Sequence, residues 1–230
     1  MSELILTIRP QPGCSETVAA GKAAGLPIEG YPLFEIWPIE WDAPRPEAID
    51  GLLLGSANAL RHGSEALEAF RAKPVHAVGE ATAREAEALG FTVASTGRGG
   101  LQALVDGLSP PLRLLRITGA DHVPLTPPTG IEIETQIAYQ SEPFALPDLL
   151  ACRLAGGAIV LLHSAAGARH FASECDRLAV PRRAVSLAAL GPRIASAAGE
   201  GWREVRSASE PREAALLALA RQMCHDPAGG

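Results

Sequence analysis

The chain has 230 residues, of which 47% are hydrophobic and 20% are charged, with a formal net charge of −6. This composition is typical of a globular protein with one large core or two smaller ones, and the acidic balance argues against a nucleic-acid-binding surface. No apolar run approaches the roughly 20 residues that a membrane-spanning helix needs. The first residues show no signal-peptide pattern. The four cysteines lack metal-site and CxxC spacing, so we expect a reducing, cytoplasmic location and no metal.

The N-terminal part predicts a short strand, a helix and a second strand. Leu4–Ile8 is almost entirely apolar, as in a strand buried on both faces. A helix is expected over 15–24, ended by Gly25, and a short strand over 28–31. The stretch 33–41 is extended, and the prolines after it favour a connector, because proline fits neither a central strand nor a helix interior.

From Gly51 onward, strands and helices alternate. Strands are predicted over 52–54, 75–78, 91–94 and 112–117, and helices over 57–70, 80–89 and 100–107. The segment 118–130 carries three prolines and is expected to be a loop, followed by a long strand over 131–139. The second half of the chain repeats the alternation, with strands at 158–162, 185–188 and 202–206 and helices at 146–154, 165–178, 191–198 and 210–224.

An internal repeat supports two related sheets. Ser56 and Ser164, each at the expected N-cap of a helix, are separated by 108 positions, as are His62 and His170. Further along, Gly79 matches Gly191 at a separation of 112, and other pairs keep that offset. The matched order predicts two βα-repeating units, each with a parallel sheet covered by helices.

Four strand-to-helix turns are candidate ligand sites, because open α/β sheets bind ligands beyond the carboxyl ends of their strands. Each turn offers free backbone N–H groups and a helix dipole, which contributes roughly 0.3–1 kcal/mol toward an anion. Several such turns around one ligand would hold a polyanion, whereas for any single turn simple helix capping is the alternative. The turns are Ser56-Ala57-Asn58, Gly79-Glu80-Ala81-Thr82, Ser164-Ala165-Ala166 and Gly191-Pro192-Arg193.

Three further side chains are candidates for chemistry. Arg9 and Arg116 stand at or just inside strand ends, where they would meet carboxylates or form surface ion pairs. Tyr139 ends a strand and is the best-placed phenol for donating a proton, although an interface aromatic would occupy the same place. Phosphate-binding glycine motifs and the GxSxG elbow are absent from the sequence.

Taken in order, several of these motifs resemble the uroporphyrinogen-III synthase family. The resemblance rests on Leu6-Thr7-Ile8-Arg9-Pro10, Ser56-Ala57-Asn58-Ala59, the run from Ala77 to Ala83, Tyr139 after a strand, the Ser164 turn and Leu190-Gly191-Pro192. It implies an α/β fold of two flavodoxin-like parallel-sheet domains joined by a two-stranded connector, with the active site in the interdomain cleft. One domain would comprise 1–36 plus 143–230, and the other 37–142.

The resemblance also implies a reaction. The family closes hydroxymethylbilane to uroporphyrinogen III, with inversion of ring D and loss of water, as a cyclising lyase of haem biosynthesis that needs no cofactor. Tyr139 would be the proton donor. The implied substrate-binding residues are Arg9, Ser56, Ala57, Asn58, Gly79, Glu80, Thr82, Arg116, Ser164, Ala165, Gly191, Pro192 and Arg193. A monomer is expected, with transient contact to hydroxymethylbilane synthase and none to nucleic acid or membrane.

Three departures from the family pattern keep two alternatives open. Arg193-Ile194 replace the threonines common after Gly191-Pro192, Gly55 and His163 precede the turn serines, and 118–130 replaces a helix. The alternatives are a divergent homologue of low activity and a non-catalytic two-lobed protein that binds a small anion or a tetrapyrrole.

Overall fold

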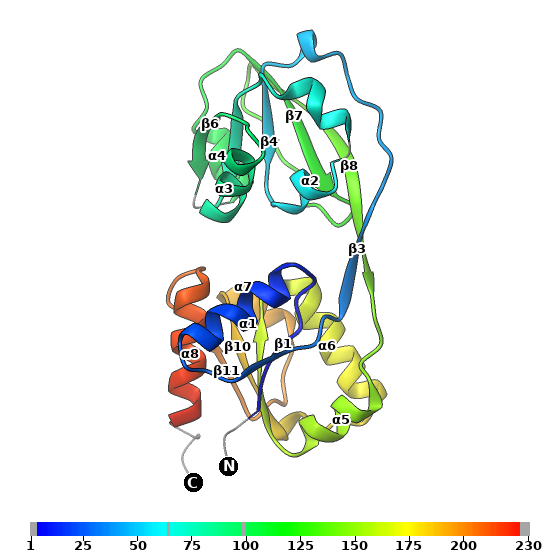
Figure 1. Cartoon of the computed structure of the whole chain (residues 1–230), viewed down its shortest axis with the longest axis vertical. Coiled ribbons are helices and arrows are strands. Elements are labelled where there is room, and N and C mark those ends of the chain that lie inside the picture. Colours follow the sequence, from blue (N-terminus) through cyan, green and yellow to red (C-terminus); the bar gives the residue numbers. More distant parts are fainter. Residues whose placement is uncertain (1–3, 64, 98–99, 226–230) are drawn as a thin grey trace. The chain divides into compact units, whose positions relative to one another are not determined.

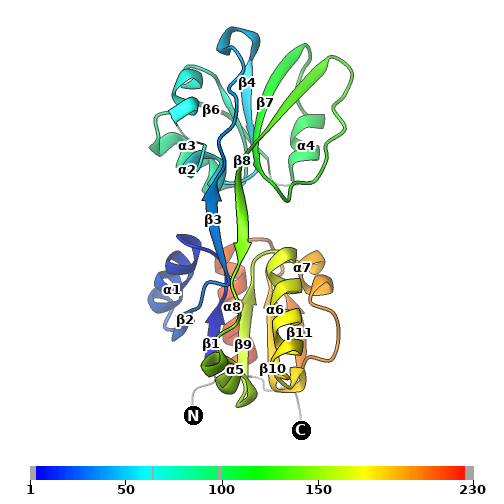
Figure 2. The same ribbon diagram turned by 90° about the vertical axis from the view of Figure 1, so that its right-hand side faces the viewer.

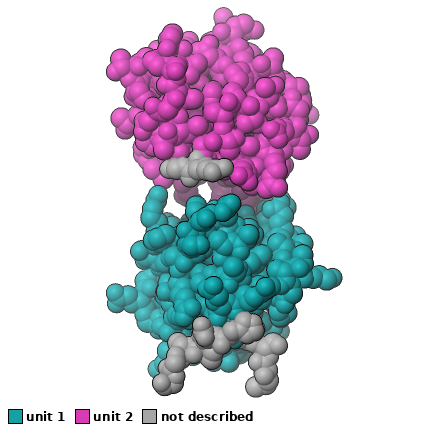
Figure 3. All heavy atoms as spheres, turned by 90° about the vertical axis from the view of Figure 1, so that its left-hand side faces the viewer, with its two compact units in different colours: residues 1–35, 142–230 teal, residues 36–141 magenta. Residues whose placement is uncertain are grey.

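A computed structural model describes residues 4–63, 65–97 and 100–225 (Figure 1). The chain forms two compact units, residues 1–35 with 142–230 (unit 1) and residues 36–141 (unit 2) (Figure 3). It passes from unit 1 to unit 2 in β3 (Phe34–Pro38) and returns in β8 (Ile131–Pro143), two hydrogen-bonded neighbours. No helix in the described residues is long and apolar enough to cross a membrane.

Unit 1 is a five-stranded parallel sheet with helices on both faces. Its strands lie in the order β11-β10-β9-β1-β2, which is the flavodoxin order 2-1-3-4-5 when they are numbered along unit 1. Its elements are β1 (Leu4–Thr7), α1 (Gly13–Ala23), β2 (Ile28–Gly30), α5 (Asp148–Ala155), β9 (Ala158–Leu162), α6 (Ala165–Arg177), β10 (Val185–Ala189), α7 (Pro192–Ala197), β11 (Glu204–Ser207) and α8 (Glu213–His225).

The apolar runs of the central strands follow from this double coverage. Leu6 and Val160 pack with α5, α6 and α7, whereas Ile5 and Ile159 point to the other face and pack with α1 and α8 (Figure 2). Every residue of β9 is buried. A strand covered on both faces has no place for a polar alternation, which is why its sequence is continuously apolar.

Unit 2 has a six-stranded sheet in the order β3-β8-β7-β4-β5-β6. The five strands from β8 to β6 are parallel, and β3 lies at the edge. The other elements are β4 (Gly51–Leu54), α2 (Asn58–Arg61), a 3-10 helix (Glu65–Phe70), β5 (Val75–Val78), α3 (Glu80–Ala88), β6 (Val93–Gly97), α4 (Leu101–Asp106) and β7 (Leu112–Gly119). The predicted α/β fold class is confirmed, and β3 makes this second sheet mixed rather than purely parallel.

The two faces of the unit 2 sheet are covered unequally. Leu52 and Leu115 pack in the cluster that includes residues of α2, the 3-10 helix and α3. Leu53 and Leu114 point the other way, toward α4 and toward Leu125 of the segment between β7 and β8. That segment contains no helix, so proline-rich loop residues cover part of a face that a crossover helix usually covers.

The sequence repeat agrees with the strand positions. The matched pairs β4 and β9, β5 and β10, and β6 and β11 occupy the same places in the two sheets, and β7 and β8 take the places of β1 and β2. Leu53 is paired with Arg116, and Leu161 is paired with Thr7. Since Leu53 and Leu161 are themselves separated by the repeat offset of 108, Arg116 and Thr7 occupy equivalent positions in the two units.

One predicted helix is wrong. The sequence pattern favours a continuous helix over 57–70, but α2 ends at Arg61 and a 3-10 helix begins at Glu65. The indole Nε1 of Trp41 donates a 2.9 Å hydrogen bond to the Gly63 carbonyl, which a continuing helix would present to Leu67. The Trp41 side chain therefore occupies the Gly63 carbonyl, the hydrogen-bond acceptor that a continuous helix over 57–70 would need.

Candidate active site

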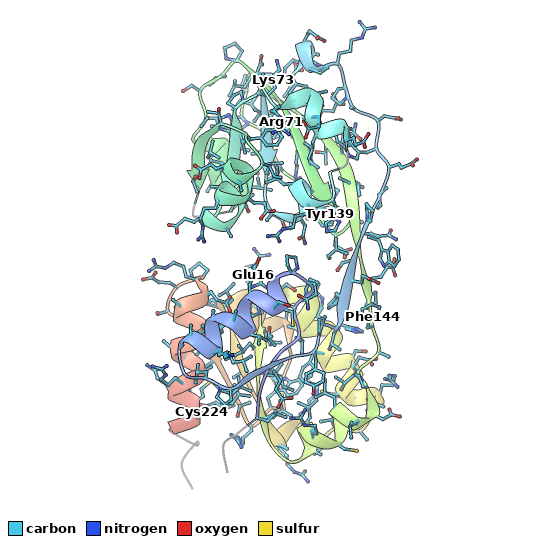
Figure 4. The ribbon with its side chains drawn as sticks, viewed as in Figure 1. Glu16, Arg71, Lys73, Tyr139, Phe144 and Cys224 are labelled. Atoms are coloured by element: carbon cyan, nitrogen blue, oxygen red, sulfur yellow. The ribbon has the colours of Figure 1, made fainter. Side chains whose placement is uncertain are left out.

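The turn between β4 and α2 and the end of β8 form a polar constellation within unit 2. Ser56 Oγ accepts a 3.2 Å hydrogen bond from the Asn58 N–H, and the Ser56 hydroxyl is also hydrogen-bonded to the phenol of Tyr139. The helix cap itself is Ala57, so Ser56 is not the N-cap that the sequence suggested. Figure 4 shows the Tyr139 side chain beside β8, in the part of unit 2 that holds α2.

Gly119 allows the Tyr139 ring to lie against the end of β7. The two residues are paired in register, and a Cβ at Gly119 would lie 2.5 Å from Cε2 of the tyrosine ring. A backbone hydrogen bond at Gly119 also reaches the phenol. Glycine is therefore required here by close approach, and the neighbouring strand fixes the ring on one side.

The environment of Tyr139 keeps the phenol protonated at neutral pH. Burial raises its pKa, while the hydrogen bonds from Ser56 and Gly119 and the charge of Arg116 lower it, and the net shift is upward. The His62 ring lies 6.1 Å from the tyrosine ring, between centroids. Burial and the nearby Arg61 lower the pKa of His62, so this imidazole is neutral near pH 7. The phenol is therefore protonated and has a proton to give, and its hydrogen bonds, which oppose the effect of burial, would favour the phenolate that forms.

Arg116 lies in the core of unit 2, on β7. The residue is only 4% exposed, and its Nη2 donates a 2.9 Å hydrogen bond to the Val123 carbonyl. Its Nε is buried without a hydrogen-bond partner, and burial lowers the pKa of the guanidinium. Such a position leaves almost no surface for the direct substrate contact expected from the sequence.

A second polar cluster lies in unit 1, beyond the carboxyl ends of β1 and β9. Glu213, in the first turn of α8, accepts hydrogen bonds from Thr17 at 2.7 Å and from Arg9 at 3.4 Å. Nε2 of His163, which follows β9, lies 3.1 Å from the same carboxylate. Glu213 therefore partly neutralises the positive charge of Arg9, which leaves Arg9 less able to attract an anionic ligand.

The electrostatics of this cluster favour an ionised Glu213. Burial raises the pKa of Glu213, but the hydrogen bonds and charges of His163, Thr17 and Arg9 outweigh it, and the net shift is downward. The sequence reasoning missed Thr17 and Glu213 altogether. The available signal was their place near the starts of helices that follow strands of the same sheet, close to the strand ends that Arg9 and His163 follow.

The strand-to-helix turns differ in how strongly their backbone N–H groups and helix dipoles can attract an anion. Ser164 is a true N-cap and accepts a 3.0 Å hydrogen bond from the Gly167 N–H at the start of the 13-residue α6. Gly79 begins the nine-residue α3 with a φ of 80°, which glycine adopts readily. By contrast, α2 has four residues and α7 has six, so these helices contribute smaller dipoles.

The other predicted residues of these turns vary in exposure. Thr82 is buried inside unit 2, with 5% of its surface exposed. By contrast, the exposed residues are Glu80, Ser164, Pro192 and Arg193. Ala57, Asn58, Ala165 and Gly191 are half-buried. Contact between Thr82 and a ligand would require α3 to move, whereas the exposed residues need no rearrangement.

Neither a metal cluster nor the described cavity in unit 2 coincides with these residues. In the part of the chain that the structure describes, no three His, Cys, Asp or Glu side chains are grouped as a metal site requires. A cavity of about 140 Å³ opens at the amino ends of β7 and β8 in unit 2, away from the Tyr139 turn. Its lining residues are Ile49, Arg113, Leu114, Glu132, Ile133 and Glu134.

An α/β protein of two units, each with polar turns beyond the carboxyl ends of parallel strands, belongs to the class that binds small molecules at those ends. The sequence profile of the family described as uroporphyrinogen-III synthase HemD matches residues 15–218. The chain therefore belongs to the uroporphyrinogen-III synthase family, as the sequence motifs indicated.

Solved structures support the same fold. A uroporphyrinogen-III synthetase from Helicobacter pylori 26695 is 16% identical, with a TM-score of 0.65, covering 96% of this chain and 99% of the other. A mutant uroporphyrinogen III synthase from the extremely thermophilic bacterium Thermus thermophilus is 15% identical, with a TM-score of 0.54, covering 97% and 99%. A search of curated proteins gave no match. At these identities the two structures show the fold alone.

Proposed function

We propose that the protein is an active uroporphyrinogen-III synthase, which closes hydroxymethylbilane to uroporphyrinogen III with inversion of ring D and loss of water. The observation that carries the proposal is the Tyr139 phenol, protonated and held by Ser56 and Gly119 at the end of a sheet. Family membership gives the class of substrate, and this phenol gives a group able to start the reaction.

The chemistry begins with loss of the terminal hydroxyl. Tyr139 transfers its proton to that hydroxyl, the carbon–oxygen bond breaks with its electron pair on oxygen, and water leaves. The remaining cation is delocalised over the adjoining pyrrole and is attacked by the substituted α-carbon of ring D, at the other end of the chain. The bond from that carbon to its original methylene bridge then breaks, and the free α-carbon of ring D bonds to the released bridge cation, which inverts the ring. The proton that this carbon loses passes to solvent, and solvent returns one to Tyr139. Dehydration and ring closure involve no change of oxidation state, so the proposal needs no metal or organic cofactor.

The acetate and propionate carboxylates of the substrate suit the strand-end turns of both units. In unit 2 the proposed contacts are Ser56, Ala57, Asn58, Gly79 and Glu80, with Thr82 after movement of α3. In unit 1 they are Arg9, Ser164, Ala165, Gly191, Pro192 and Arg193. Backbone N–H groups and helix dipoles would hold these anions without a large basic surface, in keeping with the net charge of −6. Catalysis would then consist mainly of placing the chain so that ring inversion precedes closure.

The product isomer tests the proposal. Freshly prepared hydroxymethylbilane is incubated with the protein, the products are oxidised to porphyrins, and the type I and type III isomers are separated. We expect type III in clear excess over a protein-free control. If only the spontaneous type I isomer forms, the enzyme proposal fails, and retention of the bilane on the protein would then favour the binding-protein alternative.

A further inference from the structure

We propose that Thr17 is a positioning residue for Arg9, and that with Gly13 it holds the guanidinium so that Nε and Nη2 of Arg9 receive a carboxylate of the substrate. The inference rests on the proposed function and deepens it. It adds two residues of α1 to a contact that otherwise depends on Arg9 alone, and it names an acetate or propionate group as the ligand of Arg9.

The hydrogen bonds of Arg9 occupy only one end of its guanidinium. Nη1 donates a 3.4 Å hydrogen bond to Oγ1 of Thr17 and another of 3.4 Å to the Glu213 carboxylate. Within the described part of the chain, 4–63, 65–97 and 100–225, Nε and Nη2 have no hydrogen-bond partner, and 31% of the Arg9 side chain is exposed. Two neighbouring guanidinium donors can bind a carboxylate through two parallel hydrogen bonds, so this arrangement leaves a carboxylate-binding edge open.

Thr17 is the residue at which the contacts of the cluster meet. Its hydroxyl donates a 2.7 Å hydrogen bond to Glu213, accepts the one from Arg9, and lies 3.5 Å from Nε2 of His163. One hydroxyl can donate once and accept twice, so it can serve these neighbours together. Thr17 is 0% exposed and lies out of reach of a ligand. Its effect on the substrate therefore has to pass through Arg9.

Gly13 supports the end of the guanidinium that Thr17 does not contact. A Cβ at Gly13 would lie 2.4 Å from Nε and 2.6 Å from Nη2 of Arg9, so the guanidinium rests directly on the backbone at the start of α1. Only glycine permits this approach. Gly13 and Thr17 are four positions apart and share one face of α1, so this helix face contacts Arg9 at both ends of its guanidinium.

The distances within the cluster also allow Arg9 to serve a ligand. The Glu213 carboxylate lies 2.7 Å from Thr17 and 3.1 Å from His163, closer than the 3.4 Å to Arg9. Glu213 therefore keeps its two shorter hydrogen bonds when Arg9 binds another carboxylate. A guanidinium that is already held in place loses little side-chain freedom on binding, which favours affinity and offsets part of the attraction that Glu213 removes.

The test separates substrate binding from turnover. Thr17→Val removes the hydroxyl and keeps the shape of the side chain, whereas Thr17→Ser keeps the hydroxyl. We expect Thr17→Val to raise KM for hydroxymethylbilane about threefold to tenfold with kcat nearly unchanged, because a lost hydrogen bond changes affinity by that factor. The Kd of uroporphyrinogen III, measured calorimetrically without oxygen, should rise by a similar factor. Thr17→Ser should retain the wild-type values.

Thr7→Val is the matched control in the same unit. Thr7 is also 0% exposed, but its hydroxyl oxygen has no hydrogen-bond partner in the described residues. This variant removes a buried hydroxyl that does not contact Arg9, so KM and Kd should stay unchanged.

A double-mutant cycle distinguishes positioning of Arg9 from general support of the fold. Arg9→Ala should raise KM by about tenfold or more, and in that background Thr17→Val should raise it no further. Gly13→Ala is the second route and replaces Thr17→Val if the latter does not fold. Its added Cβ displaces only the end of a flexible side chain, so KM should rise with little loss of stability, and again only when Arg9 is present.

Each remaining outcome has a distinct meaning. In a protein that forms the type III isomer, an unchanged KM and Kd in a folded Thr17→Val variant would overturn this inference alone. An equal rise in KM with and without Arg9 would also overturn it, because the hydroxyl would then support the fold of unit 1 and not the guanidinium. If the wild-type protein yields only the type I isomer, the proposed function fails, whatever the binding measurements show.

Discussion

Tyr139 is one of two tyrosines, and the comparison between them isolates its role. We expect Tyr139→Phe to slow type III formation by about 10²-fold or more, because phenylalanine fills the ring site but carries no proton. Tyr31→Phe is the matched control, since Tyr31 is hydrogen-bonded to Glu29 and Arg153 in unit 1. Isomer assays and circular dichroism on both variants are the measurement. Unchanged turnover in a folded Tyr139→Phe variant would remove Tyr139 from the mechanism.

Glu174 is a residue whose charge stabilises unit 1. Its carboxylate accepts hydrogen bonds from Arg177 and from the Leu146 N–H at 2.6 Å. The Arg177 hydrogen bond is the main reason why its pKa is lowered from 4.5 to about 2. Because the folded-state pKa lies below the unfolded one, this stabilisation is complete above about pH 4.5 and is lost as the pH falls from 4.5 toward 2.

The Glu174→Gln variant tests the direction of this pH dependence. At pH 7 the variant should be less stable by about 1–3 kcal/mol, because a buried charged hydrogen-bond acceptor is lost. Between about pH 5 and about pH 3 the wild-type protein should lose more stability than the variant, so the two curves converge. Denaturant unfolding followed by tryptophan fluorescence is the measurement; Trp202, which stacks on Phe171 in unit 1, contributes to this signal together with Trp37 and Trp41 of unit 2. The control is Glu200→Gln, which changes an exposed carboxylate of unit 1. If the stability difference between Glu174→Gln and the wild-type protein is the same at every pH, the lowered pKa of Glu174 is contradicted.

At the scale of elements, the end of β7 is shaped to receive the ring on β8. A Cβ at Gly119 would meet the Tyr139 ring at 2.5 Å, whereas one at Gly107 of the same unit meets nothing nearer than 3.5 Å. Gly119→Ala should displace the ring and reduce type III formation at least about tenfold, with a larger loss of stability than Gly107→Ala. Activity assays and thermal unfolding of the two variants provide the comparison. If both variants are equally active, type III formation does not depend on the close fit between the Tyr139 ring and Gly119.

The elements also show what could be predicted from the sequence. Leu52–Leu54 and Ala158–Leu162 are strands because continuous apolar runs fit a sheet covered on both faces, and this signal is local. The N-cap role of Ser164 is local as well, because the cap bonds to an N–H three residues later.

The features that escaped prediction depend on distant partners. The break of the 57–70 helix is set by Trp41, and the pairing of Arg9 with Glu213 joins residues 204 positions apart. The burial of Arg116 follows from sheet order and from how the 120–130 segment covers β7, neither of which a single strand motif encodes. The strands could therefore be predicted, whereas the polar partners could not.

At the scale of the whole molecule, the cysteines are confined to unit 1. Cys152 is exposed and Cys224 is partly buried, while Cys14 and Cys175 are buried. Burial raises the pKa of Cys14, and raises that of Cys175 to about 12, so few thiolates form.

Alkylation under native conditions should therefore follow this order. Cys152 should react first and Cys224 more slowly, and Cys14 and Cys175 should react only when unit 1 opens, which time-resolved mass spectrometry of labelled peptides would record. Because the reactive groups all lie in one unit, slow labelling measures the opening of unit 1 independently of unit 2. Labelling of Cys175 as fast as that of Cys152 would contradict the described core.

The interrupted chain of unit 1 has a consequence for how the protein is made on the ribosome. β1 hydrogen-bonds to β9, whose residues are translated about 150 positions later, whereas every parallel partner of β4 lies within unit 2. At about 5–20 residues per second, β1 waits on the order of ten to thirty seconds for that neighbour. During this interval the nascent sheet of unit 2 can close, while the apolar edge of β1 stays open to chaperones or to other nascent chains.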